Sequence, residues 1–313
     1  MLLYILRRLL SGVTVLVVLA CATFTLLYFS STNIARNLLG ELATAEQVAA
    51  KEQELGLDRP LIVRLFEWLG SAIHGDLGVS WFTSQPVTQA LATRLPVTLT
   101  VIAVSTVGLA LFAISFGILS AVKRGWVDRV LQVVAVTMQA IPDFIIALVF
   151  VVFFAVTLGW LPATSTISPG SGVDAWVTSL VLPVVALVVN GFAGTAQQFR
   201  SAVITEFEKD YVRTLRSRGT PEMIILFKHV LRNAAPAGLT VLSLRLIGML
   251  GGVVIIEKIF ALPGMGNLAV QSTITGDIPI VMGVVIYTGL IVIGVNLLVD
   301  LANAALNPKV RVS

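Results

Sequence analysis

The chain has 313 residues, of which 57% are hydrophobic and 12% are charged, with a formal net charge of +4 and a mean hydropathy of +0.94. This balance excludes an ordinary soluble globular domain. The basic residues cluster beside apolar segments and form no continuous stripe, which excludes nucleic acid as an expected partner.

Six apolar runs are long enough to cross a lipid bilayer as helices. They cover residues 9–29, 97–122, 130–158, 177–199, 237–257 and 279–302. The first run is longer than the apolar part of a signal peptide and lacks a clear cleavage site, so it is interpreted as a membrane helix. The predicted fold class is therefore an all-α membrane protein with about six transmembrane helices.

The connections between these runs predict how the chain is divided and oriented. We expect an N-terminal transmembrane helix at 1–29, an extracytoplasmic segment with interfacial helices at 30–95, a core of five transmembrane helices at 96–304, and a tail at 305–313. Lysine and arginine gather in the connections on one side, which the positive-inside rule assigns to the cytoplasm. These residues are Arg7, Arg8, Lys123, Arg124, Arg129, Arg200, Lys209, Arg213, Arg216, Arg218, Lys228, Arg232, Lys309 and Arg311. Both termini are then cytoplasmic.

Two further features are predicted along the chain. In the extracytoplasmic segment, Thr44 precedes Glu46, and Trp68 and Trp81 follow, which is typical of amphipathic helices outside the membrane. In the third apolar run, Pro142 removes a backbone donor and favours a kink.

Within the predicted cytoplasmic elbow at 200–236, the stretch from 206 to 233 is too charged to span a membrane and too periodic to be a loose loop. Phe207, Tyr211 and Leu215 recur every four residues, which predicts one face of a short helix. Gly219 suits the end of that helix. Residues 220–222, Thr-Pro-Glu, are typical of an N-cap, a first-turn proline and an acid at the start of a second helix.

The predicted unit is helix, tight elbow, helix, a shape that can transmit a push from a soluble partner into the spans. The alternative is an amphipathic helix lying on anionic lipid.

No catalytic or metal-binding motif is found. The phosphate-binding pattern GxxxxGK[ST] does not occur, so ATP hydrolysis by this chain is not expected. His74 and His229 fall on opposite predicted sides of the membrane and cannot hold one metal ion together. We therefore expect a chain that is not an enzyme and binds no cofactor or metal.

Ionisable residues inside spans are costly and are candidates for function. Asp143, Arg245 and Glu257 are the candidates for a translocation pathway, where an arginine could hold a peptide carboxylate and an acid its amine. Salt bridges inside the bundle or snorkelling to the interface are the alternative. Asp300, near a helix end, is interpreted as structural.

Several stretches together resemble one known family. They are DYVRTLRSRG at 210–219, ELGLDRPL at 54–61, GDLGVS at 75–80, RLPVTL at 94–99, IIEKIFALPGMGNL at 255–268, DIPIVMG at 277–283 and NLLVDLANAALNPKVR at 296–311. The chain resembles the permeases of binding-protein-dependent ABC importers, in the dipeptide and oligopeptide branch, and the permease encoded first of the two. Leu215 stands where the family commonly has alanine, and residues 31–34, Asn303, Asn307 and Lys309 also depart from its pattern.

The resemblance implies a type I importer permease in the cell inner (plasma) membrane. It implies a second homologous permease, two ATP-binding subunits that carry ATP and Mg, an extracytoplasmic solute-binding protein, and a peptide cargo. It also implies a coupling helix that contacts one ATPase, formed by Tyr211, Val212, Arg213, Thr214, Leu215, Arg216, Ser217, Arg218 and Gly219. Glutathione, haem and metal chelates remain alternative cargoes, and an ion-coupled secondary transporter acting as a homodimer is the alternative function.

Overall fold

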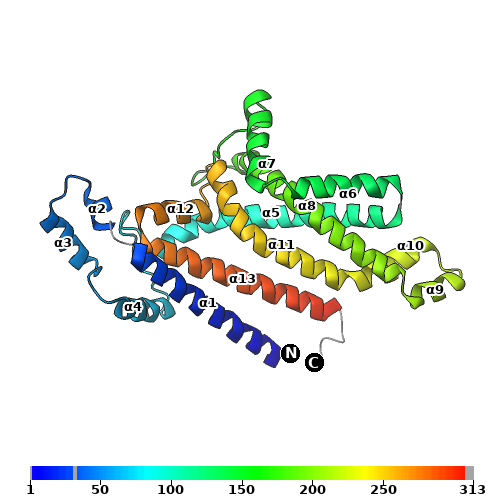
Figure 1. Cartoon of the computed structure of the whole chain (residues 1–313), viewed down its shortest axis with the longest axis horizontal. Helices are drawn as coiled ribbons and strands as arrows, with labels where there is room; N and C mark the ends of the chain where they lie inside the picture. The colour runs from blue at the N-terminus through cyan, green and yellow to red at the C-terminus, as the bar shows by residue number, and fades with distance from the viewer. Residues whose placement is uncertain (1, 31–33, 124, 307–313) are drawn as a thin grey trace. The chain divides into compact units, whose positions relative to one another are not determined.

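The computed structural model describes residues 2–30, 34–123 and 125–306. In chain order the elements are α1 (Leu2–Ser30), α2 (Ile34–Leu39), α3 (Ala45–Glu54), α4 (Leu61–Ile73), α5 (Val87–Val122), α6 (Trp126–Gln139), α7 (Asp143–Phe150), the π-helix η1 (Val151–Thr157), α8 (Val173–Phe207), α9 (Asp210–Ser217), α10 (Glu222–Ile224), the π-helix η2 (Ile225–Val230), α11 (Leu231–Ile259), α12 (Met265–Thr275) and α13 (Ile278–Leu306). Figure 1 shows this order. No β-strand occurs among the described residues, and the all-α expectation is confirmed. Arg124, residues 31–33 of the departure at 31–34, and residues 307–313 of the predicted tail lie outside the described residues.

Six membrane crossings are present if one bent pair counts as a span. Five helical stretches are long and apolar enough on their own: 6–30, 87–122, 173–207, 222–259 and 278–301. The sixth is the pair 128–138 and 143–157, bent by 96°. The expectation of about six transmembrane helices is confirmed.

The bend lies where Pro142 predicted a kink, but the chain breaks there instead of curving. Pro142 is the N-cap residue of α7, with φ −59° and ψ 145°. Proline cannot donate a hydrogen bond, and its ring disfavours helical backbone in the preceding residue, so α6 ends before it. The run predicted at 130–158 is therefore two helices.

The chain forms two compact units, each described separately. Unit 1 comprises residues 1–98 and 263–293, and unit 2 comprises 99–262 and 294–313. The long helices α5 and α13 each contribute to both.

In unit 1, α1 packs along the first part of α13, and the two run side by side in Figure 1. Phe24 of α1 forms a buried hydrophobic cluster together with Ile278 and Met282 of α13. Outside these spans, Thr44 caps α3: its hydroxyl accepts from Gln47 N, and the Gln47 side chain accepts from Thr44 N. This reciprocal pair satisfies two otherwise free amides at the start of α3.

In unit 2, α8 is the central helix and packs against α6, α7 and α11 (Figure 1). Where α8 meets α11, Gly238 faces the ring of the buried residue Phe199. A Cβ atom at Gly238 would lie 2.7 Å from Phe199 Cδ2, closer than real contacts allow. Glycine is required here by the close approach of two helices, as is common in membranes.

Gly238→Ala is expected to lower the stability of unit 2 by about 1–3 kcal/mol, since the buried ring has to move to admit the methyl group. Gly248→Ala on the same helix is the control, because nothing lies within 4 Å of its added Cβ. Thermal unfolding in detergent measures both. Equal melting temperatures for the two variants would contradict the close-packing interpretation.

Candidate functional site

The predicted elbow is present as α9, a short helix between the end of α8 and the start of α10. Tyr211 and Leu215 lie on α9, whereas Phe207 is the last residue of α8. The prediction that all three share one helix is therefore wrong, because the backbone turns at 208–209. All three nevertheless pack against the same buried cluster.

Gly219 closes α9 in the conformation that its sequence position predicted. Its φ is +75°, in the left-handed region. Gly219 N donates to Arg216 O at 2.9 Å, and Thr220 N donates to Leu215 O at 3.1 Å. This pair of bonds is the Schellman arrangement, which glycine adopts without strain.

The second arm begins one residue later than predicted. Thr220 was the expected N-cap, but Pro221 occupies that position, with φ −57° and ψ 139°, and Glu222 is the first helical residue. No side chain caps this end. From Glu222 the chain stays helical through η2 into α11, so the elbow joins directly to a span.

Val212 anchors α9 to the spans. It is fully buried in a cluster that includes Val203 of α8, Ile225 and Val230 of η2, and Ala121 at the end of α5. Densely packed side chains transmit displacement instead of absorbing it. A force applied to α9 therefore reaches three spans.

Polar contacts add to this anchoring. The buried carboxylate of Glu206, at the end of α8, accepts from Tyr211 Oη at 3.1 Å and pairs with Lys209. Burial raises the pKa of Tyr211 above its ordinary value, so the phenol stays a donor. Arg216 donates to both carboxylate oxygens of Glu222, at 2.6 and 3.2 Å, which ties the two arms together. This hydrogen bonding raises the pKa of Arg216.

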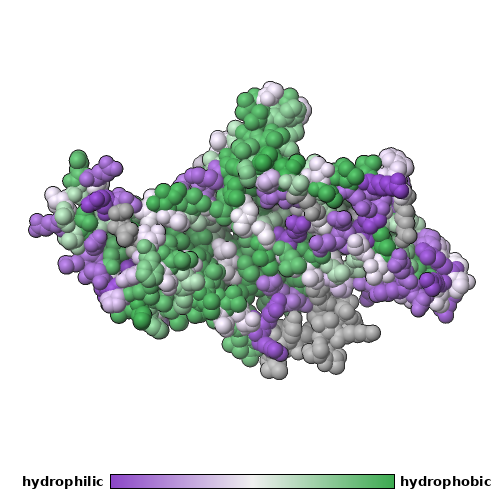
Figure 2. Space-filling view, viewed as in Figure 1, coloured by the Kyte–Doolittle hydropathy of each residue, from purple (hydrophilic) through white to green (hydrophobic). Residues whose placement is uncertain are grey.

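The outer face of the elbow is cationic. Among the nine residues predicted for coupling, Val212 is buried and Tyr211 and Leu215 are half-buried. Six are exposed: Arg213, Thr214, Arg216, Ser217, Arg218 and Gly219. Hydrophilic side chains gather over α9 in Figure 2. Such a face suits an acidic protein surface.

Two features beside α9 were not predicted from the sequence. Met223, Ile224 and Phe227 on the second arm have exposed fractions of 64%, 46% and 58%. A hollow of about 360 Å³ also opens next to α9. Its lining residues are Ala121, Val122, Phe207, Glu208, Arg213, Arg216 and Glu222. The elbow thus combines charge, exposed apolar area and a concave surface, as protein interfaces do.

The three pathway candidates lie in unit 2 but do not meet at one point. Glu257 is fully buried and Arg245 half-buried, both on α11. They are twelve residues apart, which is a rise of about 18 Å along a helix. Asp143, the first residue of α7, lies at an intermediate height, with Oδ2 3.3 Å from the position of a Cβ on Gly252.

An ion pair between the buried Asp128 and the half-buried Arg200, which sequence reasoning missed, joins three spans of unit 2. Arg200 of α8 donates to Asp128 of α6 through Nε at 2.7 Å and through Nη2 at 2.6 Å. Gln132 donates to the same carboxylate at 3.1 Å, and Ser120 of α5 also donates to it. Arg200 was assigned to a cytoplasmic connection, but it lies within α8. The sequence did offer one signal for this ion pair: Asp128 lies at the edge of the apolar run at 130–158.

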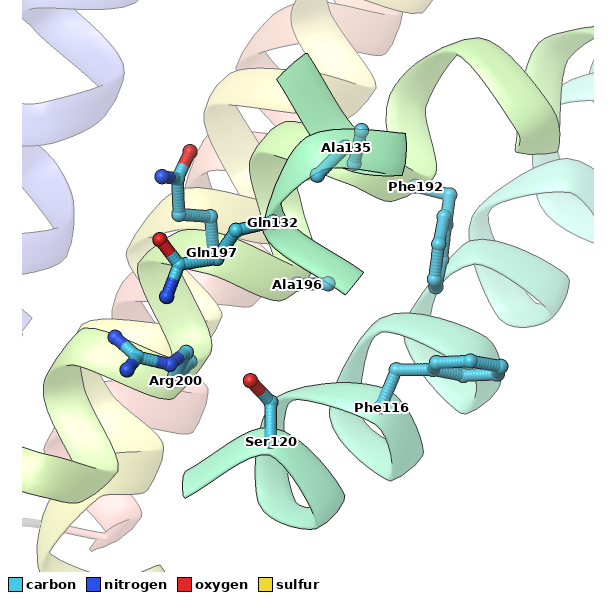
Figure 3. Close-up of a pocket in the computed structure, with 9 residues that line it drawn as sticks. Phe116, Ser120, Gln132, Ala135, Phe192, Ala196, Gln197 and Arg200 are labelled. Carbon is cyan, nitrogen blue, oxygen red and sulfur yellow. The ribbon is translucent and has the colours of Figure 1, made fainter. Parts of the chain in front are cut away.

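A small pocket of about 20 Å³ adjoins this pair. Figure 3 shows the polar ends of Ser120, Gln132 and Arg200 on one side and the rings of Phe116 and Phe192 on the other. The volume suits about one water molecule and no larger ligand. Nor do the described residues include a cluster of three or more His, Cys, Asp or Glu side chains that could hold a metal ion.

Comparison with known families decides what kind of protein carries this elbow. The model described as "Binding-protein-dependent transport system inner membrane component" matches residues 113–312, and the model of its N-terminal region matches 1–102. The chain belongs to this family. The resemblance to the permeases of binding-protein-dependent ABC importers is confirmed, and this permease is a multi-pass membrane component of an ABC importer.

Full-length relatives agree with this assignment. A protein of Brucella abortus (strain 2308) described as a peptide transport system permease is 36% identical over 308 residues, covering 98% of each chain. A Sinorhizobium fredii protein described as a peptide ABC transporter permease is 35% identical, covering 98% of this chain and 99% of the relative. The glutathione transport system permease protein GsiC of Salmonella choleraesuis is 35% identical, covering 99% of both.

A solved structure shares the fold. A chain of the MetNI methionine ABC transporter, in inward facing conformations, superposes on the permease with a TM-score of 0.55. The identity is 19%, and the match covers 72% of the permease and 100% of that chain. The expected ABC importer permease architecture is thus confirmed.

Proposed function

We propose that this permease imports peptides, forming the translocation pathway together with a second homologous permease. The observation that carries the proposal is the anchored elbow: α9 presents exposed arginines on one face and buries Val212 among three spans on the other. The names of the relatives, peptide and glutathione systems at 35–36% identity, support a peptide cargo. Glutathione is itself a small peptide, so both names indicate the same chemical class.

In this proposal, Tyr211 to Gly219 form the coupling helix, which contacts one of two ATP-binding subunits. Those subunits hold ATP and Mg and hydrolyse the nucleotide, and this chain is not an enzyme. The helices α10, η2 and α11 follow one another without a loop. This continuity supports the coupling role of α9, because a rotation of the elbow is transmitted directly into a span.

The same proposal sets the orientation. The elbow and both termini are cytoplasmic, as the clustered lysines and arginines favour, and the protein lies in the inner (plasma) membrane. A solute-binding protein delivers cargo on the opposite side. Asp143, Arg245 and Glu257 contribute charged groups along the pathway. Their separate heights support successive contacts with a moving peptide.

Co-purification tests the proposal. The tagged permease, extracted from its native membranes in mild detergent, is expected to retain a second permease and a subunit with a phosphate-binding loop, identified by mass spectrometry. The double variant Arg213→Glu, Arg218→Glu is expected to co-purify with at least about tenfold less ATP-binding subunit, because its new carboxylates then face an acidic surface. The amount of second permease is expected to stay the same.

The control is Arg36→Glu, which reverses an exposed arginine on α2 in unit 1. It is expected to retain every partner. Purification of the wild type as a homodimer without an ATP-binding subunit would contradict the proposal and favour an ion-coupled transporter.

A further inference from the structure

A second hollow, of about 250 Å³, lies within unit 1. It is enclosed by the turn at 80–86, the first turns of α5 and the helix α12. Its polar lining residues are Ser80, Thr83, Gln85, Thr93, Arg94, Gln271, Ser272, Thr275 and Asp277. Typical ligand pockets measure roughly 300–1,000 Å³, so this hollow fits one end of an extended molecule.

Arg94 is the only cationic residue in this lining. It is half-buried, and within the described part of the chain its guanidinium has neither a hydrogen bond nor an acidic partner within ion-pair distance. Other arginines differ: Arg59 pairs with Glu67 and Arg200 with Asp128. A guanidinium carries five donors in a planar fork that matches a carboxylate. The hollow therefore presents donors that an external carboxylate can satisfy.

The acid in the same lining is already occupied. Asp277 is buried and accepts from Ser80 Oγ at 2.5 Å and from Trp81 N at 3.2 Å. Ser80 Oγ in turn accepts from Thr83 N at 3.0 Å. Asp277 therefore holds the turn at 80–86 in place as one wall of the hollow, and among the described residues it forms no ion pair with Arg94.

The remaining lining suits a peptide main chain. Gln85 and Gln271 carry amides that both donate and accept, and Thr93 and Thr275 carry hydroxyls. A carrier of varied peptides has to bind what all of them share, which is the backbone and the charged ends.

We propose that this hollow is a carboxylate subsite, in which Arg94 binds the C-terminal carboxylate of a peptide before the peptide crosses. The inference rests on the proposed peptide transport and adds the part of the cargo that this chain recognises. Arg94 belongs to the segment at 30–95, which the proposed orientation places on the extracytoplasmic side, where the solute-binding protein delivers cargo.

The test compares Arg94→Gln with the wild type in cells that carry the whole transport system. The probe is a mixture of di- to tetrapeptides of random sequence, offered as free acids and as C-terminal amides, and internalised peptides are measured by mass spectrometry. The ratio of acid to amide uptake is expected to fall by about tenfold in the variant, as loss of a charge-assisted contact requires. Arg94→Lys, which keeps the charge, is expected to restore part of the ratio.

A second measurement removes the contribution of the binding protein. Equilibrium dialysis of the same mixture against the complex purified in detergent, without binding protein, is expected to show about tenfold weaker retention of free acids by Arg94→Gln. Arg36→Gln, at an exposed arginine on α2, is the matched control and is expected to change neither reading.

Each outcome distinguishes the two proposals. If the wild type imports no peptide, the proposed function fails and the subsite with it. Suppose instead that peptides are imported, but Arg94→Gln lowers the uptake of free acids and of amides equally, or changes neither the uptake ratio nor the retention in dialysis. Arg94 is then structural, and only the subsite is overturned.

Discussion

Replacing Gly219 by valine is expected to reduce ATP-driven peptide uptake at least about tenfold while the permease still inserts and is present at normal abundance. Gly219 has a φ of +75°, and an L-residue in left-handed backbone costs about 1–2 kcal/mol, more for a β-branched side chain. The strain falls on the two hydrogen bonds that close α9, from Gly219 N and Thr220 N. The elbow then changes shape where its outer face meets the ATP-binding subunit.

Gly170→Val is the matched control for this prediction. Gly170 has a φ of +85°, and like Gly219 it has nothing within 4 Å of an added Cβ, so the substitution introduces the same kind of backbone strain away from the elbow. Uptake per transporter in proteoliposomes is the measurement, with ATP hydrolysis recorded in parallel. Wild-type uptake by Gly219→Val, or an equal loss in both variants, would count against the coupling role of the elbow.

Asp128→Asn is expected to destabilise unit 2 by about 3 kcal/mol, because it leaves the half-buried Arg200 guanidinium without its counter-charge. The Asp128 and Arg200 side chains are only 12% and 21% exposed, so water replaces only part of the lost interaction. For a unit of this size the expected fall in apparent melting temperature is about 6–12 °C. The loss should appear in detergent without any partner present.

Two comparisons separate charge burial from a general effect of substitution. Glu67→Gln breaks the pair with Arg59, whose side chains are 53% and 46% exposed, and is expected to cost no more than about 1 kcal/mol. The double variant Asp128→Leu, Arg200→Met removes both charges and is expected to recover most of the lost stability. A melting temperature for Asp128→Asn within the error of the wild type would show that the pair does not hold the three spans together.

Local sequence signals located the elbow closely but did not define its packing. Gly219 ends α9 as predicted, because the left-handed cap depends on one residue's backbone preference. Phe207 was assigned to the wrong helix, since periodicity alone cannot detect a turn that keeps the apolar face aligned. Pro142 marked a break, but a 96° bend depends on what the two halves pack against.

The sequence by itself determined the membrane class, the six apolar segments and the glycine-closed elbow, because hydropathy, length and turn preference are properties of neighbouring residues. Only the tertiary structure decided which distant groups meet. Asp128 and Arg200 are 72 positions apart, and Ser80 and Asp277 are 197 apart. The same holds for the burial of Val212 and for Arg94 facing a hollow. Which distant residues come into contact depends on how whole helices pack, and a local sequence pattern does not contain that information.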